Sequence, residues 1–200
     1  MCNLERHIEN VNKFGVPSIV SINVFPTDTE AEIAAVEEEC AKIGVQAVRS
    51  DHHNDGGAGA MGLAQAVVET IDNKKSEFKL LYPDEMSLEN KIRTIATEIY
   101  GAADIAVEPK AAVKLRKFEK AGHGHFPICV AKNQYSFSAD PKALGAPSGH
   151  IVPVRDVRLS AGAEFVVALT GDIMTMPGLP KIPASEHVGL DESGHIHGLF

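Results

Sequence analysis

The sequence has no tryptophan and only three cysteines in 200 residues. The cysteines (Cys2, Cys40 and Cys129) are odd in number and widely spaced, which favours a reducing, cytoplasmic setting over a disulfide scaffold. No apolar run approaches the roughly 20 residues of a membrane span. The N-terminal stretch MCNLERHIEN also has no apolar segment like that of a secretory signal. We therefore expect a cytoplasmic protein that does not contact a membrane.

Positive charge is also scarce. The chain has 19 Lys and Arg against 27 Asp and Glu, a net charge of −8 with neutral histidine. The basic residues form no block, so a nucleic-acid partner is not expected. Apolar residues make up 44% of the chain, which is enough for a folded core and argues against wholesale disorder.

The apolar periodicity predicts an α/β fold with parallel-sheet βαβ units in its first part. Residues 16–25 form a nearly continuous β-branched run, typical of a parallel strand covered on both faces. Thr27 and Glu30 fit a capping box, T-x-x-E, at the start of the next helix. Apolar residues at helical spacing in that helix are expected to face inward. They are Ile33, Val36, Cys40 and Ile43.

Later segments predict a smaller α+β region. Ser87 is expected to cap a helix that ends near Gly101, and residues 126–132 read as another strand. Two late strands resemble an antiparallel hairpin, with Val152, Val154 and Val157 on one side of the first. The tail from residue 172 is rich in Pro and Gly and is expected to be extended.

We divide the chain into three parts. Residues 1–75 form an α/β segment, residues 76–160 a smaller α+β lobe, and residues 161–200 a strand and an extended tail that returns to the first segment.

Common nucleotide and nucleophile motifs are missing or weak. The chain has no G-x-x-x-x-G-K-[ST] P-loop and no G-x-S-x-G elbow around Ser160 or elsewhere. Residues 57–62 match G-x-G-x-x-G, but they begin seven residues after the strand instead of directly after it. A loop that packs a helix closely explains this glycine run better than a dinucleotide site.

The histidine clusters predict no metal site. His52, His53 and Asp55 are close in sequence, but adjacent side chains in an extended segment point in opposite directions. The pairs His123 with His125 and His195 with His197 lie in glycine-rich turns, where solvated loop histidines are the simpler interpretation. Cys40 and Cys129 read as small core residues.

One edge of the predicted sheet is a better candidate for ligand binding. Phe25 and a polar cluster follow the first strand, and the loop of residues 50–57 follows the next. The carboxyl ends of parallel strands meet at one edge, where α/β proteins bind ligands. A flat ligand can stack between Phe25 and this loop. The alternative is that Phe25 is a core residue capping the strand.

Several distinctive stretches run from Asn3 to Phe200. They read NLERHIENVNKFGVPSIVSINVFPTDTEAE, KIRTIATEIYGA, NQYSFSADP, VRDVRLSAGAEFVVALTG, IMTMPGLPK and the terminal GLF. In these stretches the chain resembles formate–tetrahydrofolate ligase (10-formyltetrahydrofolate synthetase), and together they are highly specific for this family.

The resemblance implies the C-terminal portion of a cytoplasmic, ATP-dependent ligase of one-carbon metabolism, which joins formate to tetrahydrofolate. In the family, ATP with Mg binds at a P-loop in the N-terminal portion, which is missing here, and the enzyme is a homotetramer. We therefore expect a fragment without catalytic or metal-binding residues of its own. Apolar surface is expected to be exposed where the missing portion docks.

The resemblance also implies two folate-binding residues. It places Phe25 on one face of the pterin ring, and His53 on the other face, where the family has Trp. Asp55 stands where the family has Lys, and Asn133 where Thr is more common. Imidazole offers less stacking area than indole, and an acid beside an anionic substrate is unfavourable, so we expect weaker folate binding.

Two hypotheses follow from these observations. The first is a ligase fragment that carries one wall of the folate pocket and is inactive alone. The second is a degenerate, non-catalytic module that binds a planar ligand or a partner subunit. The first requires Phe25 and His53 to face each other across a slot about as wide as one heterocycle.

Overall fold

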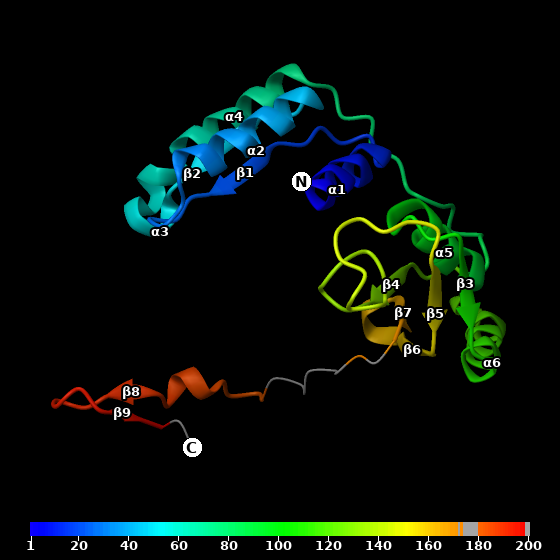
Figure 1. The fold of residues 1–200 in the computed structure, drawn as a ribbon. Helices are drawn as coiled ribbons and strands as arrows, with labels where there is room; N and C mark the ends of the chain where they lie inside the picture. Colours follow the sequence, from blue (N-terminus) through cyan, green and yellow to red (C-terminus); the bar gives the residue numbers. More distant parts are fainter. Residues whose placement is uncertain (172, 174–179, 199–200) are drawn as a thin grey trace.

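The computed structural model describes residues 1–171, 173 and 180–198. Figure 1 shows two lobes joined by the segment between α4 and α5, and a C-terminal arm that extends from the second lobe. The first lobe contains β1 (Val20–Asn23), α2 (Glu30–Lys42), β2 (Ala47–Ser50), α3 (His52–Asp55), η1 (Gly56–Ala60) and α4 (Met61–Asn73). The N-terminal helix α1 (Cys2–Lys13) packs instead against the second lobe, where Asn10 donates to the Ile99 carbonyl and His7 contacts Phe137.

The second lobe and the arm contain the remaining elements. The lobe holds α5 (Leu88–Thr94), η2 (Ile95–Ile99), β3 (Asp104–Val107), α6 (Pro109–Phe118), η3 (Glu119–His123), β4 (Ile128–Ala131), β5 (Ile151–Val154), β6 (Asp156–Ser160), η4 (Ala161–Ala163) and β7 (Phe165–Leu169). The arm holds η5 (Ala184–Glu186), β8 (Gly189–Leu190) and β9 (Ile196–His197).

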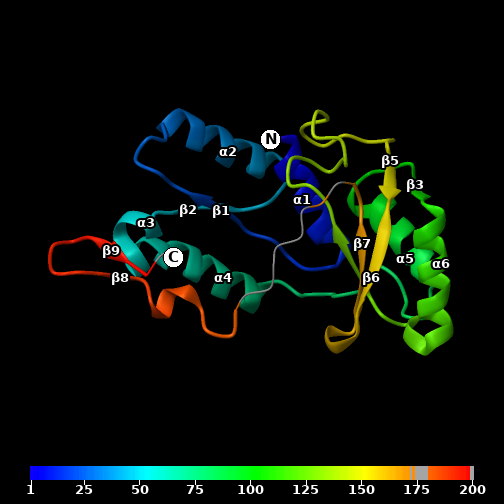
Figure 2. The same cartoon turned by 90° about the horizontal axis from the view of Figure 1, so that it is seen from below.

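In the first lobe, β1 and β2 form a parallel pair between two helices. Arg49 of β2 forms ion pairs with Glu30 and Glu37 of α2, so α2 covers the face to which Arg49 points. Val48 points to the opposite face, where it lies against α4 at Gly62. Figure 2 shows the two strands between these helices.

Two details of this lobe differ from the sequence prediction. The capping box is formed by Thr29 and Glu32, not by Thr27 and Glu30. The Thr29 hydroxyl accepts a hydrogen bond from the Glu32 backbone N–H, and the Glu32 carboxylate accepts one from the Thr29 N–H. Residues 25–28 form a turn first, so the helix begins two residues later than predicted.

The expected complete cover of the first strand is also wrong. β1 spans only Val20–Asn23, and Ser21 and Asn23 are exposed between half-buried Val20 and Ile22. In α2, Ile33 and Cys40 are buried as predicted, whereas Ile43 is exposed. The apolar pattern predicted the strand and the helix correctly, but the described residues include no further strand or helix that covers these exposed side chains.

The second lobe holds the main core. β3 pairs in parallel with β5, while β4, β7 and β6 form a three-stranded sheet in that order. Val152, Val154 and Val157 are buried as predicted, but they lie in two strands, because the chain breaks at Arg155 between β5 and β6. Val154 and Val157 are an odd number of positions apart, so in one continuous strand they would point to opposite faces. The break between the strands allows both to face the core. The predicted antiparallel hairpin is formed by β6 and β7.

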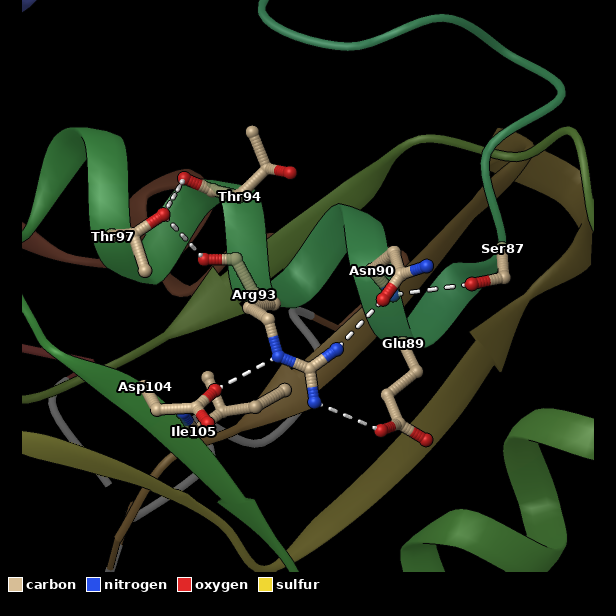
Figure 3. Close-up of polar contacts among 8 residues, drawn as sticks. All are labelled: Ser87, Glu89, Asn90, Arg93, Thr94, Thr97, Asp104 and Ile105. Atoms are coloured by element: carbon tan, nitrogen blue, oxygen red, sulfur yellow. Dashed lines mark hydrogen bonds and ion pairs between the residues drawn. The ribbon is translucent and has the colours of Figure 1, made fainter.

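Helix α5 is held to the sheet by polar contacts. Ser87 caps the helix as predicted, accepting a hydrogen bond from the Asn90 N–H. Figure 3 shows Arg93 contacting Asn90 and Glu89 on its own helix and Asp104 of β3, to which its Nε donates over 2.8 Å. This contact lowers the pKa of the Asp104 carboxyl.

The arm contains a short hairpin, β8 with β9, in a region that we expected to be simply extended. The motif IMTMPGLP and the terminal LF lie largely outside the described residues. The parallel pairs and the late antiparallel strands together confirm the predicted α/β class. The division at residues 75 and 160 stays a prediction.

Candidate functional site

The predicted aromatic pair lies at the tip of the first lobe. The ring centroids of Phe25 and His53 are 6.0 Å apart, and the ring planes are inclined by 43°. Phe25 is 45% exposed, which makes the core interpretation of this residue wrong. His53 is exposed as well. The two rings therefore lie beside each other in a tilted arrangement, and both are exposed to solvent.

The ends of the two strands hold these rings in place. Val24 continues the β1 ladder by donating its N–H to the Ser50 carbonyl over 3.0 Å. Ser50 is buried, and its hydroxyl lies 3.2 Å from Nδ1 of His52. On the other side, the Phe25 N–H donates to the Asp28 carboxylate over 2.8 Å, which fixes the turn after β1.

The loop that carries His53 is helical, so the expectation of an extended segment was wrong. The chain forms α3 directly after β2 and continues as η1 into α4. The Asp55 N–H donates to the Asp51 carbonyl, and the Asp51 N–H donates to the Gly59 carbonyl over 3.1 Å. These bonds close residues 51–59 into a compact unit that presents His53 beside Phe25.

The glycine run has a structural role at Gly59. A Cβ built at this residue would lie 2.2 Å from the Asp51 carbonyl oxygen, much closer than atoms can approach. At Gly57 a Cβ would meet nothing within 4 Å. The close backbone approach accounts for Gly59 without a dinucleotide, in agreement with the loop interpretation.

Gly59→Ala is expected to displace the loop and to lower the free energy of unfolding by about 2 kcal/mol, the usual cost of overpacking. Gly57→Ala is the matched control and should change neither the position of the loop nor the free energy of unfolding. Urea unfolding gives the stability, and the histidine ring resonances report the position of His53. Equal effects of the two substitutions would contradict this explanation of Gly59.

The slot between the rings is slightly too narrow for a ligand in its present form. A planar ring sandwiched between two others needs about 3.5 Å on each side, so the outer rings must stand about 7 Å apart and nearly parallel. Phe25 and His53 therefore have to separate by about 1 Å and rotate. Both side chains are exposed, so core packing does not fix their rotamers.

The other candidates form no comparable site. His123 and His125 both pack against Phe126, and His195 contacts Asp191 and Ser193. Within residues 1–171, 173 and 180–198, no group of three or more His, Cys, Asp or Glu side chains is placed to hold a metal ion. Cys40 is buried as predicted, but Cys129 is exposed, because the face of β4 to which it points is not covered.

Sequence reasoning missed one buried lysine, Lys91, and one half-buried lysine, Lys132. Lys91 is fully buried and donates to the carbonyls of Gly124 and Phe126, over 2.9 and 3.1 Å. Burial lowers its pKa, against the attraction of nearby carboxylates. A signal was available, because Lys91 lies at helical spacing between the apolar residues Leu88 and Ile95.

Lys132 organises the distinctive NQYSFS segment. Its ammonium donates to the backbone carbonyls of Asn133, Ser136 and Ser138, and burial lowers its pKa. Asn133 donates to the Ala139 carbonyl over 2.8 Å. This segment is thus a loop folded around one lysine, and the Asn133 side chain is part of its framework.

A parallel strand pair between two helices defines an α/β protein, a class in which ligands commonly bind at the carboxyl ends of the strands. A family model for formate–tetrahydrofolate ligase matches residues 1–200. The chain therefore belongs to the formate–tetrahydrofolate ligase family.

Individual relatives agree with this assignment. The chain is 58% identical over 198 residues to a formate–tetrahydrofolate ligase from Granulibacter bethesdensis, and 58% identical over 200 residues to one from Methylobacterium sp.. A third, from Beijerinckia indica, is 55% identical over 201 residues. These matches cover 99–100% of this chain but only 35–36% of each relative.

Proposed function

We propose that this chain provides one wall of a tetrahydrofolate site, with Phe25 and His53 stacking on opposite faces of the pterin ring. The observation that carries the proposal is the pair of exposed rings, 6.0 Å apart, at the carboxyl ends of two parallel strands. The names of the relatives supply the substrate, because they are formate–tetrahydrofolate ligases.

The chain is proposed to be the C-terminal portion of such a ligase and to be inactive alone. Its sequence contains no P-loop motif, so no residue here is assigned to ATP or Mg. Without such residues, charge on a transferring phosphoryl group would not be neutralised. The homotetramer of the family and a cytoplasmic location stay predictions. No helix in the described parts of the chain has the length and apolar character to cross a bilayer.

The alternative is a non-catalytic module, which His53 and Asp55 favour. Both are exposed, at positions where the resemblance leads us to expect Trp and Lys. Such a module would bind a different planar ligand or a partner subunit. Isothermal titration with tetrahydrofolate separates the two functions, since only the first requires binding.

The activity of the purified chain is tested by phosphate release in the presence of ATP, formate and tetrahydrofolate. We expect none above the rate of a control without formate, while tetrahydrofolate still binds in titration. Formate-dependent phosphate release would contradict the proposed inactivity. Absence of tetrahydrofolate binding would contradict the folate site.

A further inference from the structure

The outer edge of β1 has backbone groups available for another strand. Val20 and Val24 donate their N–H groups to Gln46 and Ser50, on the side of β2. Successive residues of a strand direct their N–H groups to opposite edges, so those of Ser21 and Asn23 point away from β2. Among the described residues, β2 is the only strand paired with β1.

An apolar groove of about 590 Å³ runs along the same side of the lobe, between β1 and α4. The groove also exposes much of its lining, since Val67 is 41% and Ile71 is 71% exposed. Its main apolar lining residues are Val16, Pro17, Ile19, Leu63, Val67 and Ile71. Apolar surface next to an open strand edge is typical of an incomplete sheet.

The positions of the helices indicate where the sheet continues. α2 connects β1 to β2 across one face, and α4, which follows β2, lies on the other face (Figure 2). Crossovers in parallel sheets are right-handed. A helix on the face opposite to α2 therefore leads the chain in the opposite direction across the sheet, to a strand on the far side of β1. The next strand in this chain, β3, does not fill that place, because it pairs with β5.

We propose that the outer edge of β1 pairs in parallel with a strand from the portion of the ligase that this chain does not contain. The chain corresponds to only 35–36% of its relatives, so a large complementary portion exists in them. A parallel pair of two strands is rarely stable unless further strands and helices cover it.

The partner is a strand of alternating or continuous apolar residues. Its carbonyl groups accept hydrogen bonds from Ser21 and Asn23, and its apolar side chains, with those of the segment that follows it, cover the groove at Val67 and Ile71. Its carboxyl end lies beside that of β1. In terms of the proposed function, the missing portion then contributes residues to the slot at Phe25.

Hydrogen exchange tests the strand pairing. This chain is compared with a full-length ligase in which it replaces the matched region of the Granulibacter bethesdensis protein. We expect the amides of Ser21 and Asn23 to exchange about tenfold more slowly, or slower still, in the full-length form. The Ile22 amide, directed towards β2 in both forms, is the internal control. Tetrahydrofolate affinity does not enter this measurement, so its result is independent of the folate site.

Two pairs of variants sharpen the test. Ser21→Pro removes an outward N–H and is tolerated at an open edge, while Ser21→Ala keeps it. Ile71→Glu places a charge in the groove, and Leu144→Glu places one at a similarly exposed site in the second lobe. We expect Ser21→Pro and Ile71→Glu to abolish the protection of the Asn23 amide. Their controls, Ser21→Ala and Leu144→Glu, should leave it unchanged.

Three results would overturn the proposal. One is unchanged exchange at Ser21 and Asn23 in a folded full-length protein. Another is a full-length protein that does not fold, because complementary surfaces would then be absent. The third is protection of these amides in this chain alone together with a dimer in sedimentation, which would assign the edge to a second copy.

Discussion

Replacing Phe25 with alanine is expected to weaken tetrahydrofolate binding by about tenfold or more. Stacking of an aromatic side chain on a heterocycle contributes about 1–3 kcal/mol, and 1.4 kcal/mol corresponds to a factor of ten in affinity. The half-exposed ring makes no core contribution that alanine would remove, so folding should be retained. Isothermal titration of the wild type and the variant measures the effect.

The control is Tyr135→Ala, which removes an aromatic ring of similar exposure from the second lobe and should leave the affinity unchanged. The opposite change is expected at His53, where His53→Trp provides a larger stacking surface and should raise the affinity. Binding that is indifferent to both Phe25 and His53 would refute the stacking model, even if tetrahydrofolate binds elsewhere on the chain.

Lys91→Ala is expected to lower the free energy of unfolding of the second lobe by about 3 kcal/mol. The substitution leaves the Gly124 and Phe126 carbonyls without their donor, at about 1–3 kcal/mol for each unsatisfied group, and opens a cavity. Urea unfolding followed by circular dichroism measures the loss. Lys117→Ala, at an exposed position of α6, should change the stability by less than about 0.5 kcal/mol.

The charge of Lys91 gives a further test with a defined sign. Burial lowers the pKa of Lys91 in the folded state, so the unfolded chain binds this proton more tightly. The contribution of Lys91 to stability should therefore rise with pH, from the lowered folded pKa up to the ordinary lysine value of about 10.4. Lys91→Met keeps most of the volume and should abolish this rise. A pH profile identical to that of the wild type would contradict a buried, charged lysine.

Local patterns predicted secondary structure well where the reason for it is local. Ser87 is predicted to cap α5 from its place before an apolar helical pattern, and the structure confirms the cap, because its hydroxyl accepts a hydrogen bond from the N–H three residues later. The buried valines of β5 and β6 were also identified from their spacing. The cap of α2 was placed two residues too early, because Thr27 and Thr29 both satisfy the pattern and only the turn at Phe25 decides between them.

Patterns that depend on distant neighbours were less reliable. Cys129 lies in an apolar strand and was predicted to be buried, but the face of β4 to which it points is not covered. The helix at His52 was missed because the bond that closes it, between Asp51 and Gly59, joins residues on either side of the loop. Lys91 was missed because its two acceptors lie more than thirty residues away in the sequence.

The sequence by itself determined the family, the α/β class and the two positions proposed to bind folate, because motifs and apolar periods are properties of contiguous residues. Only the tertiary structure decided that the rings at positions 25 and 53 lie beside each other, that β1 has an open edge, and that Lys91 is buried. Each of these depends on which distant segments come together, and such contacts are set by packing, which short-range sequence patterns do not encode.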